Sequence, residues 1–273
     1  SENTSFWMSA HILRALKVAQ DAGYPVELNL NGLKVEYAHT RPYRGMKLED
    51  IEILHALHEW KVEADYSSAV RLLEPFVRQL EQKEDSLANR NKYYRPLSYL
   101  KEKLLLWEIK QQVDSVNVGD SVRPYLKKDM LEGVYCDDGR RTYYWEGNQM
   151  INTLIAYRII KNDPSLCKLK ENMQLYILRT KERGWNTYQA SSAVATVLTD
   201  LLAGSGGMSG TSVSVSGKDH QRITEFPYHA RLTASDSLLI SKTGKEPLLY
   251  SVYSMKRVMN ARQSDAFKVE VTL

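Results

Sequence analysis

A helical hydrophobic period that runs through most of the chain and then stops is the feature that most limits the possible folds. Between about residues 6 and 203, apolar side chains recur every three or four positions, the pattern of amphipathic helices. The stretch Gly204-Ser-Gly-Gly-Met-Ser-Gly210 then interrupts this period, and beyond it apolar and polar residues alternate, as in half-buried strands. The chain is therefore predicted to be helical first and β-structured afterwards.

Each helical stripe predicts one helix with an apolar face toward a shared core. The first stripe stops at Gly23 with Pro25 close behind, and the second carries Glu49 and Asp50 early, where the helix dipole favours acids. The residues expected in the core are, stripe by stripe, Met8, Ile12, Ala15, Leu16 and Ala19; Leu48, Ile51, Leu54 and Leu57; Ala69, Leu72, Leu73, Phe76 and Leu80; Leu97, Leu100, Leu104 and Ile109; Ile151, Leu154, Ile155 and Ile159; Leu169, Met173, Tyr176 and Ile177; and Ala190, Ala193, Val194, Val197 and Leu201.

Several of these helices share a short phrase in which a small residue precedes aliphatic ones. It occurs at Ala10, Ala56, Ala156 and Ala193 to Ala195, and the steps from Ala10 to Ala56 and from Ala156 to Ala195 are 46 and 39 residues, the length of a helix, a loop and a returning helix. Alanines on one helix of each hairpin let neighbouring helices approach closely, as an inner ring would require. Repeated helical hairpins can close as a toroid or stay open as a solenoid.

Strands are expected only after the glycine-rich stretch. Residues 204–210 are predicted to be a flexible linker by composition, and residues 211–258 a small antiparallel β unit. The strand candidates are residues 211–216, 231–233, 238–241, 248–253 and 267–273.

Composition disfavours two classes of partner. The 273 residues carry a net charge of only +4, spread along the chain, whereas a nucleic-acid site needs Lys and Arg gathered on one face. The longest apolar runs, such as Leu104-Leu105-Leu106-Trp107, are far shorter than a membrane span. We therefore expect a mixed-charge, solvated surface, no nucleic-acid partner and no membrane insertion. Seventeen Tyr and five Trp against four Phe favour binding grooves and interfaces, because these rings keep a polar edge hydrated.

Two residue pairs could suggest metal or thiol chemistry, but neither has the necessary spacing. His55 and His58 lie three apart, yet Glu59 follows directly, which matches neither zinc-helix pattern. Both are interpreted as ordinary helix-surface histidines. Cys136 and Cys167 fit no metal or redox spacing, and one disulfide or two free thiols remain open.

Neither the glycine-rich stretch nor the Cys136 segment predicts a catalytic or cofactor site. A dinucleotide loop lies between a strand and a following helix, whereas residues 204–210 follow a helix and precede a strand. Asp137-Asp138-Gly139, directly after Cys136, is typical of a turn. We expect no catalytic residue, no metal and no cofactor.

The enzymatic alternative is a glycan-processing α/α barrel, since toroids of helical hairpins often host such enzymes. It needs two carboxylates flanking a groove and aromatic rings to stack sugars. The chain could supply these parts from one region, with Asp137, Asp138, Glu146, Trp145, Tyr143 and Tyr144. A generic protein-interaction solenoid is the other alternative.

Two segments resemble consecutive helix starts in the thioester-containing toroid of the alpha-2-macroglobulin and complement family, closest to its Bacteroidetes-type members. The first runs from Trp145-Glu-Gly-Asn148 through Thr153 and Ala156 to Tyr157-Arg-Ile-Ile160, and the second is Arg183-Gly184-Trp185-Asn186-Thr187-Tyr188. The family-motif residues carried over are structural, namely Trp145, Asn148, Thr153, Tyr157, Gly184, Trp185, Asn186, Thr187 and Tyr188. Phe6-Trp7-Met-Ser-Ala10 resembles another copy of the inner-helix pattern.

The end of the chain resembles the same family. Phe226-Pro227 and the segment from Leu238 to Tyr253 are similar to the β unit that flanks that toroid. Residues 267–273 are similar to the entry strand of a terminal macroglobulin-type sandwich, so residues 259–273 are expected to open a truncated β domain. Together with a first residue, Ser1, that is not Met, this suggests a fragment of a longer protein.

The resemblance implies an incomplete terpenoid-cyclase-like α/α toroid over residues 1–203 and mechanical trapping of proteases. In that family a protease cleaves a bait segment, the molecule rearranges, and a thioester in a Cys-Gly-Glu-Gln phrase can capture the attacker. Neither Cys136 nor Cys167 has that phrase, and Asn186-Thr187-Tyr188-Gln189 departs from the family's polar phrase at this position. The resemblance thus implies a non-catalytic structural and binding module of an extracytoplasmic endopeptidase inhibitor, periplasmic or associated with the outer membrane. Its partners would be proteases and other domains of the same chain.

Overall fold

The computed structural model describes residues 6–21, 23–32, 45–142, 149–181, 187–201, 212–216, 220–223, 228–229, 231, 233, 239–243, 248 and 250. The chain divides into two compact units, Ser1–Asp200 and Leu201–Leu273. The division falls close to the predicted linker at residues 204–210, which itself lies outside the described residues. Each unit is described by itself below.

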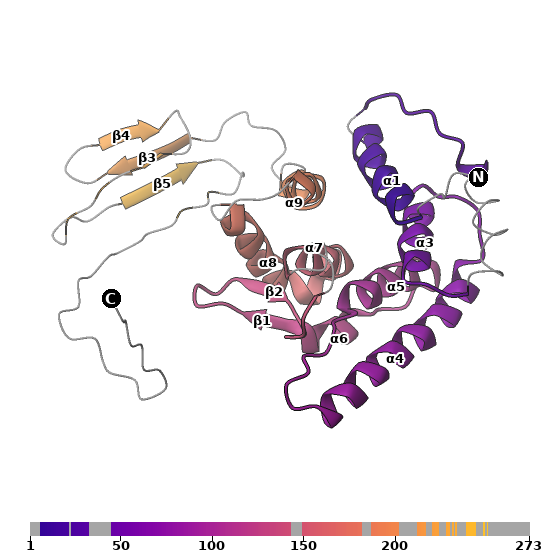
Figure 1. The fold of residues 1–273 in the computed structure, drawn as a ribbon. Coiled ribbons are helices and arrows are strands. Elements are labelled where there is room, and N and C mark those ends of the chain that lie inside the picture. Colours follow the sequence, from indigo (N-terminus) through magenta and orange to yellow (C-terminus); the bar gives the residue numbers. More distant parts are fainter. Residues whose placement is uncertain are drawn as a thin grey trace, which may run out of the picture. The chain divides into compact units, whose positions relative to one another are not determined.

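The first unit is mainly helical, as the sequence predicts (Figure 1). Each of the helices whose bounds are given below corresponds to one of the hydrophobic stripes, except the four-residue α6. The helices are α1 (Phe6–Asp21), α3 (Glu49–Glu59), α4 (Tyr66–Arg90), α5 (Leu100–Val113), α6 (Gly119–Val122), α7 (Gln149–Ile160), α8 (Cys167–Thr180) and α9 (Thr187–Ala193), with 3-10 turns at Arg123–Tyr125 and Pro164–Leu166 and a π-helical turn, η4, at Val194–Leu198.

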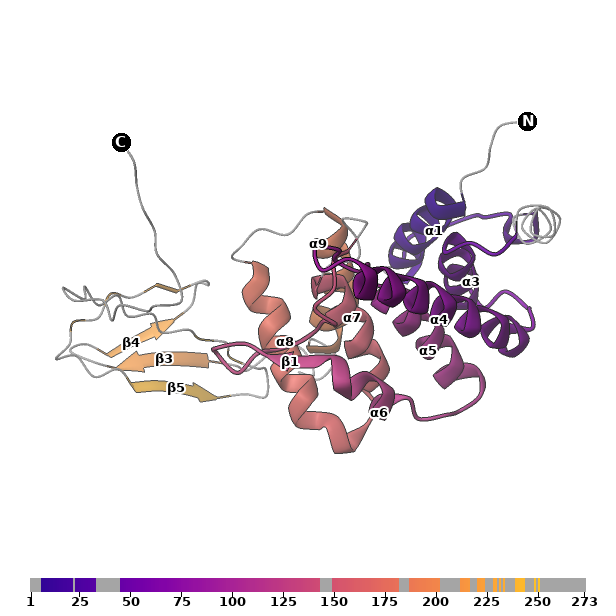
Figure 2. The ribbon, with the colours of Figure 1, turned by 60° about the horizontal axis from the view of Figure 1, so that its bottom comes forward.

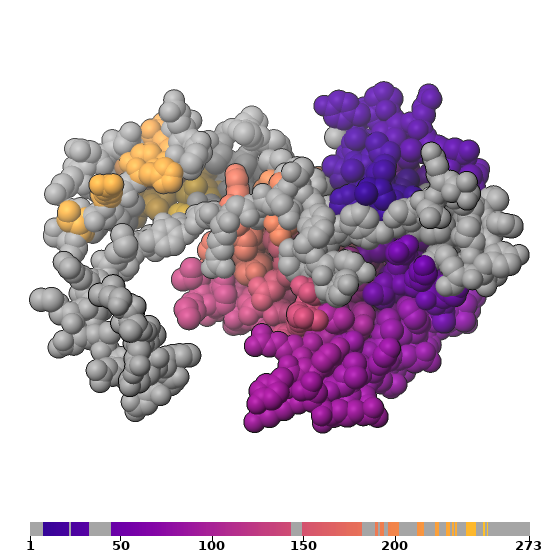
Figure 3. Space-filling model, in the orientation of Figure 1, coloured from indigo at the N-terminus to yellow at the C-terminus, as the bar shows by residue number. Residues whose placement is uncertain are grey.

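Five of the described helices, α1, α3, α5, α7 and α9, form a row in which each helix packs against its neighbours. α1 packs on α3, α3 on α5, α5 on α7, and α7 on α9, although a returning helix or hairpin separates most of these partners in sequence. α4 and α8 are the returning helices, and they pack against α5 and α7 respectively (Figures 1 and 2). α4 lies at the surface of the unit (Figure 3). This arrangement is the one expected of consecutive helical hairpins.

The central helices are buried on nearly all sides. All residues of α7 from Met150 to Tyr157 are buried, and α3 is buried from Asp50 to Leu57. A helix surrounded by other helices needs apolar residues on every face, and the α7 sequence QMINTLIAYRII provides them. Polar links join the row, since the Trp60 indole donates to the Leu13 carbonyl oxygen at 2.9 Å and Gln111 donates to the Ile159 carbonyl oxygen at 2.9 Å.

Two helices bury a different face from the predicted one. In α1 the buried residues are Ala10 and Leu13, whereas Met8 and Ile12 are about half exposed. In α4 the exposed Leu72 was expected in the core, and its neighbours Val70 and Val77 are buried instead, together with Leu73 as predicted. Both helices have apolar residues on more than one face, so only the position of the neighbouring helix decides which face is covered.

The prediction that strands occur only after residue 210 is wrong. β1 (Leu126–Lys128) and β2 (Val134–Cys136) form an antiparallel hairpin within the first unit, and β2 packs on α7 and α8. Asp129 holds the turn, because its carboxylate accepts from the backbone N–H groups of Leu131 and Gly133 and pairs with Arg179. Three-residue strands are too short to produce a recognisable alternation in sequence.

The second unit contains a three-stranded antiparallel sheet in the order β4-β3-β5. β3 (Ser212–Ser216) and β5 (Leu239–Thr243) lie where strands were expected, whereas β4 (His220–Ile223) was not predicted. Val213, Val215 and Ile223 are its buried core, with Ile240 and Leu248 packed against them. Arg231 and Thr233 are not in a strand, and residues 251–273, with the expected last strand, lie outside the described residues.

Candidate functional site

Seven charged or titratable side chains form a continuous chain between the packed helices of the first unit. Basic and acidic side chains alternate along it, and they come from the four helices α1, α3, α5 and α7. The chain runs through Lys101, Glu52, Arg14, Glu59, His55, Glu108 and Arg158. We call this set the inner ion chain.

Glu52 lies at the contact of three helices. Its Oε2 is 2.5 Å from Nη1 of Arg14 on α1, and its Oε1 is 2.5 Å from Nζ of Lys101 on α5. Burial raises the pKa of the Glu52 carboxyl, but the two cations lower it well below its usual value. Glu52 therefore stays ionised although only 5% of its side chain is exposed.

His55 is wholly buried, so the prediction of a helix-surface histidine is wrong for this residue. Its Nε2 lies 2.8 Å from Oε2 of Glu108, and its Nδ1 lies 3.5 Å from Oε2 of Glu59. Burial lowers the pKa of His55, but Glu59 and Glu108 together raise it above its usual value. The two acids therefore favour the imidazolium form.

Glu108 joins the imidazole to the last cation of the inner ion chain. Nε and Nη2 of Arg158 each donate to one of its oxygens at 2.7 Å, a bidentate pair, while Oε2 also faces His55. Burial raises the pKa of Glu108, and Arg158 and His55 lower it well below its usual value. This pair links α5 to α7.

Glu102 lies beside the inner ion chain but behaves in the opposite way. Burial raises the pKa of this carboxyl to about 7, and the neighbouring Glu52 and Asp138 add to the effect although Lys101 opposes it. Glu102, which is not part of the inner ion chain, therefore keeps its proton up to about pH 7.

The inner ion chain is built to fix helices in place. Its acids and cations are already paired with each other, and most of them are buried. Ion pairs that lie between helices define their register, because one partner left alone in the interior is costly.

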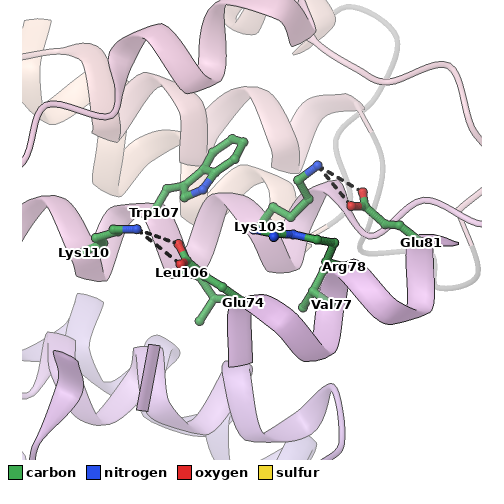
Figure 4. A pocket seen from close by; sticks show the side chains of 8 residues that line it. All are labelled: Glu74, Val77, Arg78, Glu81, Lys103, Leu106, Trp107 and Lys110. Carbon is green, nitrogen blue, oxygen red and sulfur yellow. Dashed lines mark hydrogen bonds and ion pairs between the residues drawn. The ribbon is translucent and has the colours of Figure 1, made fainter. Parts of the chain in front are cut away.

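A groove of about 350 Å³ lies on the other side of α5, against α4 (Figure 4). Two ion pairs cross it, Glu74 with Lys110 and Glu81 with Lys103, at 3.1 and 3.0 Å. The indole of Trp107 borders it, and the ammonium of Lys103 lies 5.7 Å from that ring and 5.0 Å from the ring of Tyr125. We call it the α4–α5 groove.

The two acids of the enzymatic alternative that the structure describes serve as turn residues. Asp137 accepts from the N–H of Gly139 and from Gln149 Nε2, at 2.9 and 3.0 Å. Asp138 accepts from the N–H of Arg140 at 3.0 Å and from Ser98 Oγ at 2.7 Å. Trp145, Glu146, Tyr143 and Tyr144 lie outside the described residues.

The histidine and cysteine pairs singled out in the sequence do not form shared sites among the described residues. His58 stacks edge-to-face on Tyr66 at 4.9 Å, and burial lowers its pKa, so it does not share a metal-like site with His55. Cys136 and Cys167 are both free thiols, the first buried and the second exposed. Burial and the acids that follow it raise the pKa of Cys136 to about 12, which disfavours the thiolate.

Of the family-motif residues, the structure describes the contacts of two. Thr153 accepts from the N–H of Cys136 at 2.9 Å and donates to the Gln149 carbonyl oxygen, which ties β2 to α7. Tyr157 is buried, donates to Asp200 at 3.1 Å and accepts from Gln174 at 2.8 Å. α9 begins at Thr187 and includes Tyr188. Trp145, Asn148, Gly184, Trp185 and Asn186 lie outside the described residues.

Sequence reasoning missed the inner ion chain. Its residues look like ordinary surface charges, because acids and bases three or four positions apart are typical of solvated helix faces. The one available signal was their place among apolar stripes, as in Glu52 between Ile51 and Ile53.

Among the residues that the structure describes, no cluster of His, Cys, Asp and Glu is arranged to hold a metal ion. In the same residues, no helix is long and apolar enough to cross a membrane. Comparison of the chain with known protein families, with curated proteins and with solved structures finds no match.

Proposed function

We propose that this chain is a non-catalytic structural and binding module of an alpha-2-macroglobulin-like endopeptidase inhibitor of the cell envelope. The observation that carries the proposal is the row of packed helices, α3, α5, α7 and α9, with α4 and α8 as returning helices. An α/α toroid is built from such hairpins, and a separate β unit follows the helical one here, in the order of the resemblance.

The chemistry of the described interior supports a structural role over a catalytic one. The acids of the inner ion chain are paired with cations, and Asp137 and Asp138 hold a turn. A glycosidase needs a carboxylate and an acid that face the same substrate. The row of helices joined by buried ion pairs suits a body that has to keep its shape while other parts of a trap rearrange.

Protease trapping is tested with the full-length polypeptide that contains this chain. It is incubated with a broad-specificity protease, and cleavage of a large protein substrate is compared with cleavage of a small peptide substrate. A trap should protect the large substrate and leave the small one accessible. If the polypeptide left the cleavage rate of the large substrate unchanged, the proposal would be contradicted. Release of sugar from polysaccharides by the purified chain would contradict it as well.

A further inference from the structure

The α4–α5 groove has the chemistry of a ligand site that the proposed function does not use. It is open on one side, and its volume of about 350 Å³ is within the range of small-ligand pockets. The side chains of two facing helices point into it (Figure 4). Because both helices are fixed by the packed row, the groove is preformed.

The two ion pairs offer hydrogen-bond donors and acceptors side by side. Lys110 and Glu74 form one pair, and Lys103 and Glu81 form the other. A hydroxyl group both donates and accepts, so it can bridge an ammonium and a carboxylate at once. Two such pairs suit a ligand that carries several hydroxyl groups.

Lys103 is held in place by its neighbours. Its Nζ donates to Glu81 and, at 2.8 Å, to the hydroxyl of Tyr125. Burial lowers the pKa of Lys103, but its bonds to Tyr125 and Glu81 raise it above its usual value, so it stays charged. A donor that is already ordered costs a ligand less entropy on binding.

Arg78 carries a positive charge that the two glutamates of the groove lining do not neutralise. It lies on α4 between Glu74 and Glu81, one turn from each, and among the described residues it has no ion-pair partner. With two acids and three cations lining the groove, one positive charge remains. A guanidinium pairs best with a carboxylate, in the bidentate form.

The wall formed by Trp107 completes the pattern. The face of an aromatic ring is electron-rich and attracts the C–H edge of a saturated ring. Buried Leu106 and Val77 add apolar surface beside it. The two glutamates oppose a ligand whose negative charges are concentrated on adjoining groups, such as a polyphosphate, and the ionic groups oppose a purely apolar one.

We propose that the α4–α5 groove binds an acidic saccharide, a hydroxyl-bearing ring with one carboxylate per sugar unit, of the hexuronate class. The carboxylate pairs with Arg78, the hydroxyl groups bridge the two Lys–Glu pairs, and the ring lies against Trp107. This binding is independent of protease trapping, so either can fail without the other.

Isothermal titration of the purified chain with digalacturonate tests the site. We expect saturable binding with one ligand per chain, weakened about tenfold or more by Arg78→Gln through the loss of a charge-assisted pair. Arg78 is exposed, so this variant should keep the fold. Arg90→Gln is the matched control, an exposed arginine on the same helix outside the groove, and it should bind like the unchanged chain.

Two further measurements decide the ligand class. The dimethyl ester of digalacturonate lacks the negative charges, so the unchanged chain should bind it about tenfold more weakly than it binds the acid. Arg78→Gln should bind the ester and the acid with equal affinity. Trp107→Phe should weaken the binding of digalacturonate while helical circular dichroism is retained. Absence of saturable binding, equal affinity for acid and ester, or equal weakening by Arg90→Gln would each overturn the proposal.

Discussion

Glu102 and His55 are buried side chains whose protonation favours the folded state. The pKa of Glu102 is raised by burial to about 7, so the folded chain holds its proton above the pH at which the unfolded chain releases it. The stability that this gives is complete below the unfolded value of roughly 4.3 and is lost as the pH rises through about 7. His55, with its pKa raised by Glu59 and Glu108, adds stability that is lost as the pH rises through its folded value.

Three other carboxyls have the opposite dependence. Burial raises the pKa of Glu59, but His55 and other cations lower it to about 2, and Glu52 and Glu108 are likewise lowered by their partners. Their contribution is present above the unfolded value and is lost as the pH falls toward these lowered values. The two groups of residues together place maximal stability at about pH 5–6.

Glu102→Gln isolates one part of this pH dependence. Glutamine has the same shape and does not titrate, so the unfolding free energy of the variant relative to the unchanged chain should rise by about 2 kcal/mol between about pH 5.5 and about pH 8. Urea unfolding at both values measures this. An unchanged decline between the two pH values in the variant would show that Glu102 is not the titrating group.

At the scale of the elements, the inner ion chain joins four helices that come from separate parts of the sequence. α1, α3 and α5 meet at Glu52, and α5 and α7 meet at the pair of Glu108 with Arg158. Buried pairs of this kind contribute modest net stability, but removal of one partner leaves an uncompensated charge in the interior.

Glu52→Gln should destabilise the helical unit by about 3–5 kcal/mol, because Arg14 and Lys101 then face each other without an acid between them. The matched control is Glu171→Gln, which removes a glutamate from an exposed pair with Lys168 and should change the unfolding free energy by less than about 0.5 kcal/mol. Chemical denaturation followed by circular dichroism measures both variants. Similar effects of the two substitutions would mean that Glu52 is solvated.

At the scale of the whole molecule, the two units have separate cores. The sheet of the second unit is centred on Val213, Val215 and Ile223, and residues of the second unit alone form this cluster. Tyr157 and Lys161, in turn, bond to Asp200 within the first unit. The stability of the helical unit should therefore not depend on the sheet.

A chain that ends at Leu201 tests this independence. We expect it to keep the helical circular dichroism signal and the main cooperative thermal transition of residues 1–200, since every described core residue of that unit is present. Loss of cooperativity on truncation would show that the second unit is part of the same folding unit. The small sheet alone is expected to be marginally stable, because it buries few apolar side chains.

The sequence by itself determined the helical unit, its long helices and the change to β structure. Apolar residues spaced by three or four positions leave a helix as the only way to bury them, and the alternation at β3 does the same for a strand. The stripes of α5, α7 and α8 were predicted with their core residues, such as Leu104, Leu154 and Met173. The toroid and the protease trap stay predictions.

Only the tertiary structure decided which face of α1 is covered, where the short β1–β2 hairpin lies, and which charges are buried. The sequence pattern around Glu52, His55 and Glu108 is also that of a solvated helix surface, because local spacing does not encode the distance to residues on other helices. Those three become part of an ion chain only when α1, α3, α5 and α7 pack, since Glu52 pairs with residues of α1 and α5, and Glu108 with residues of α3 and α7. The α4–α5 groove has the same origin, as its two Lys–Glu pairs join residues 22 and 36 positions apart.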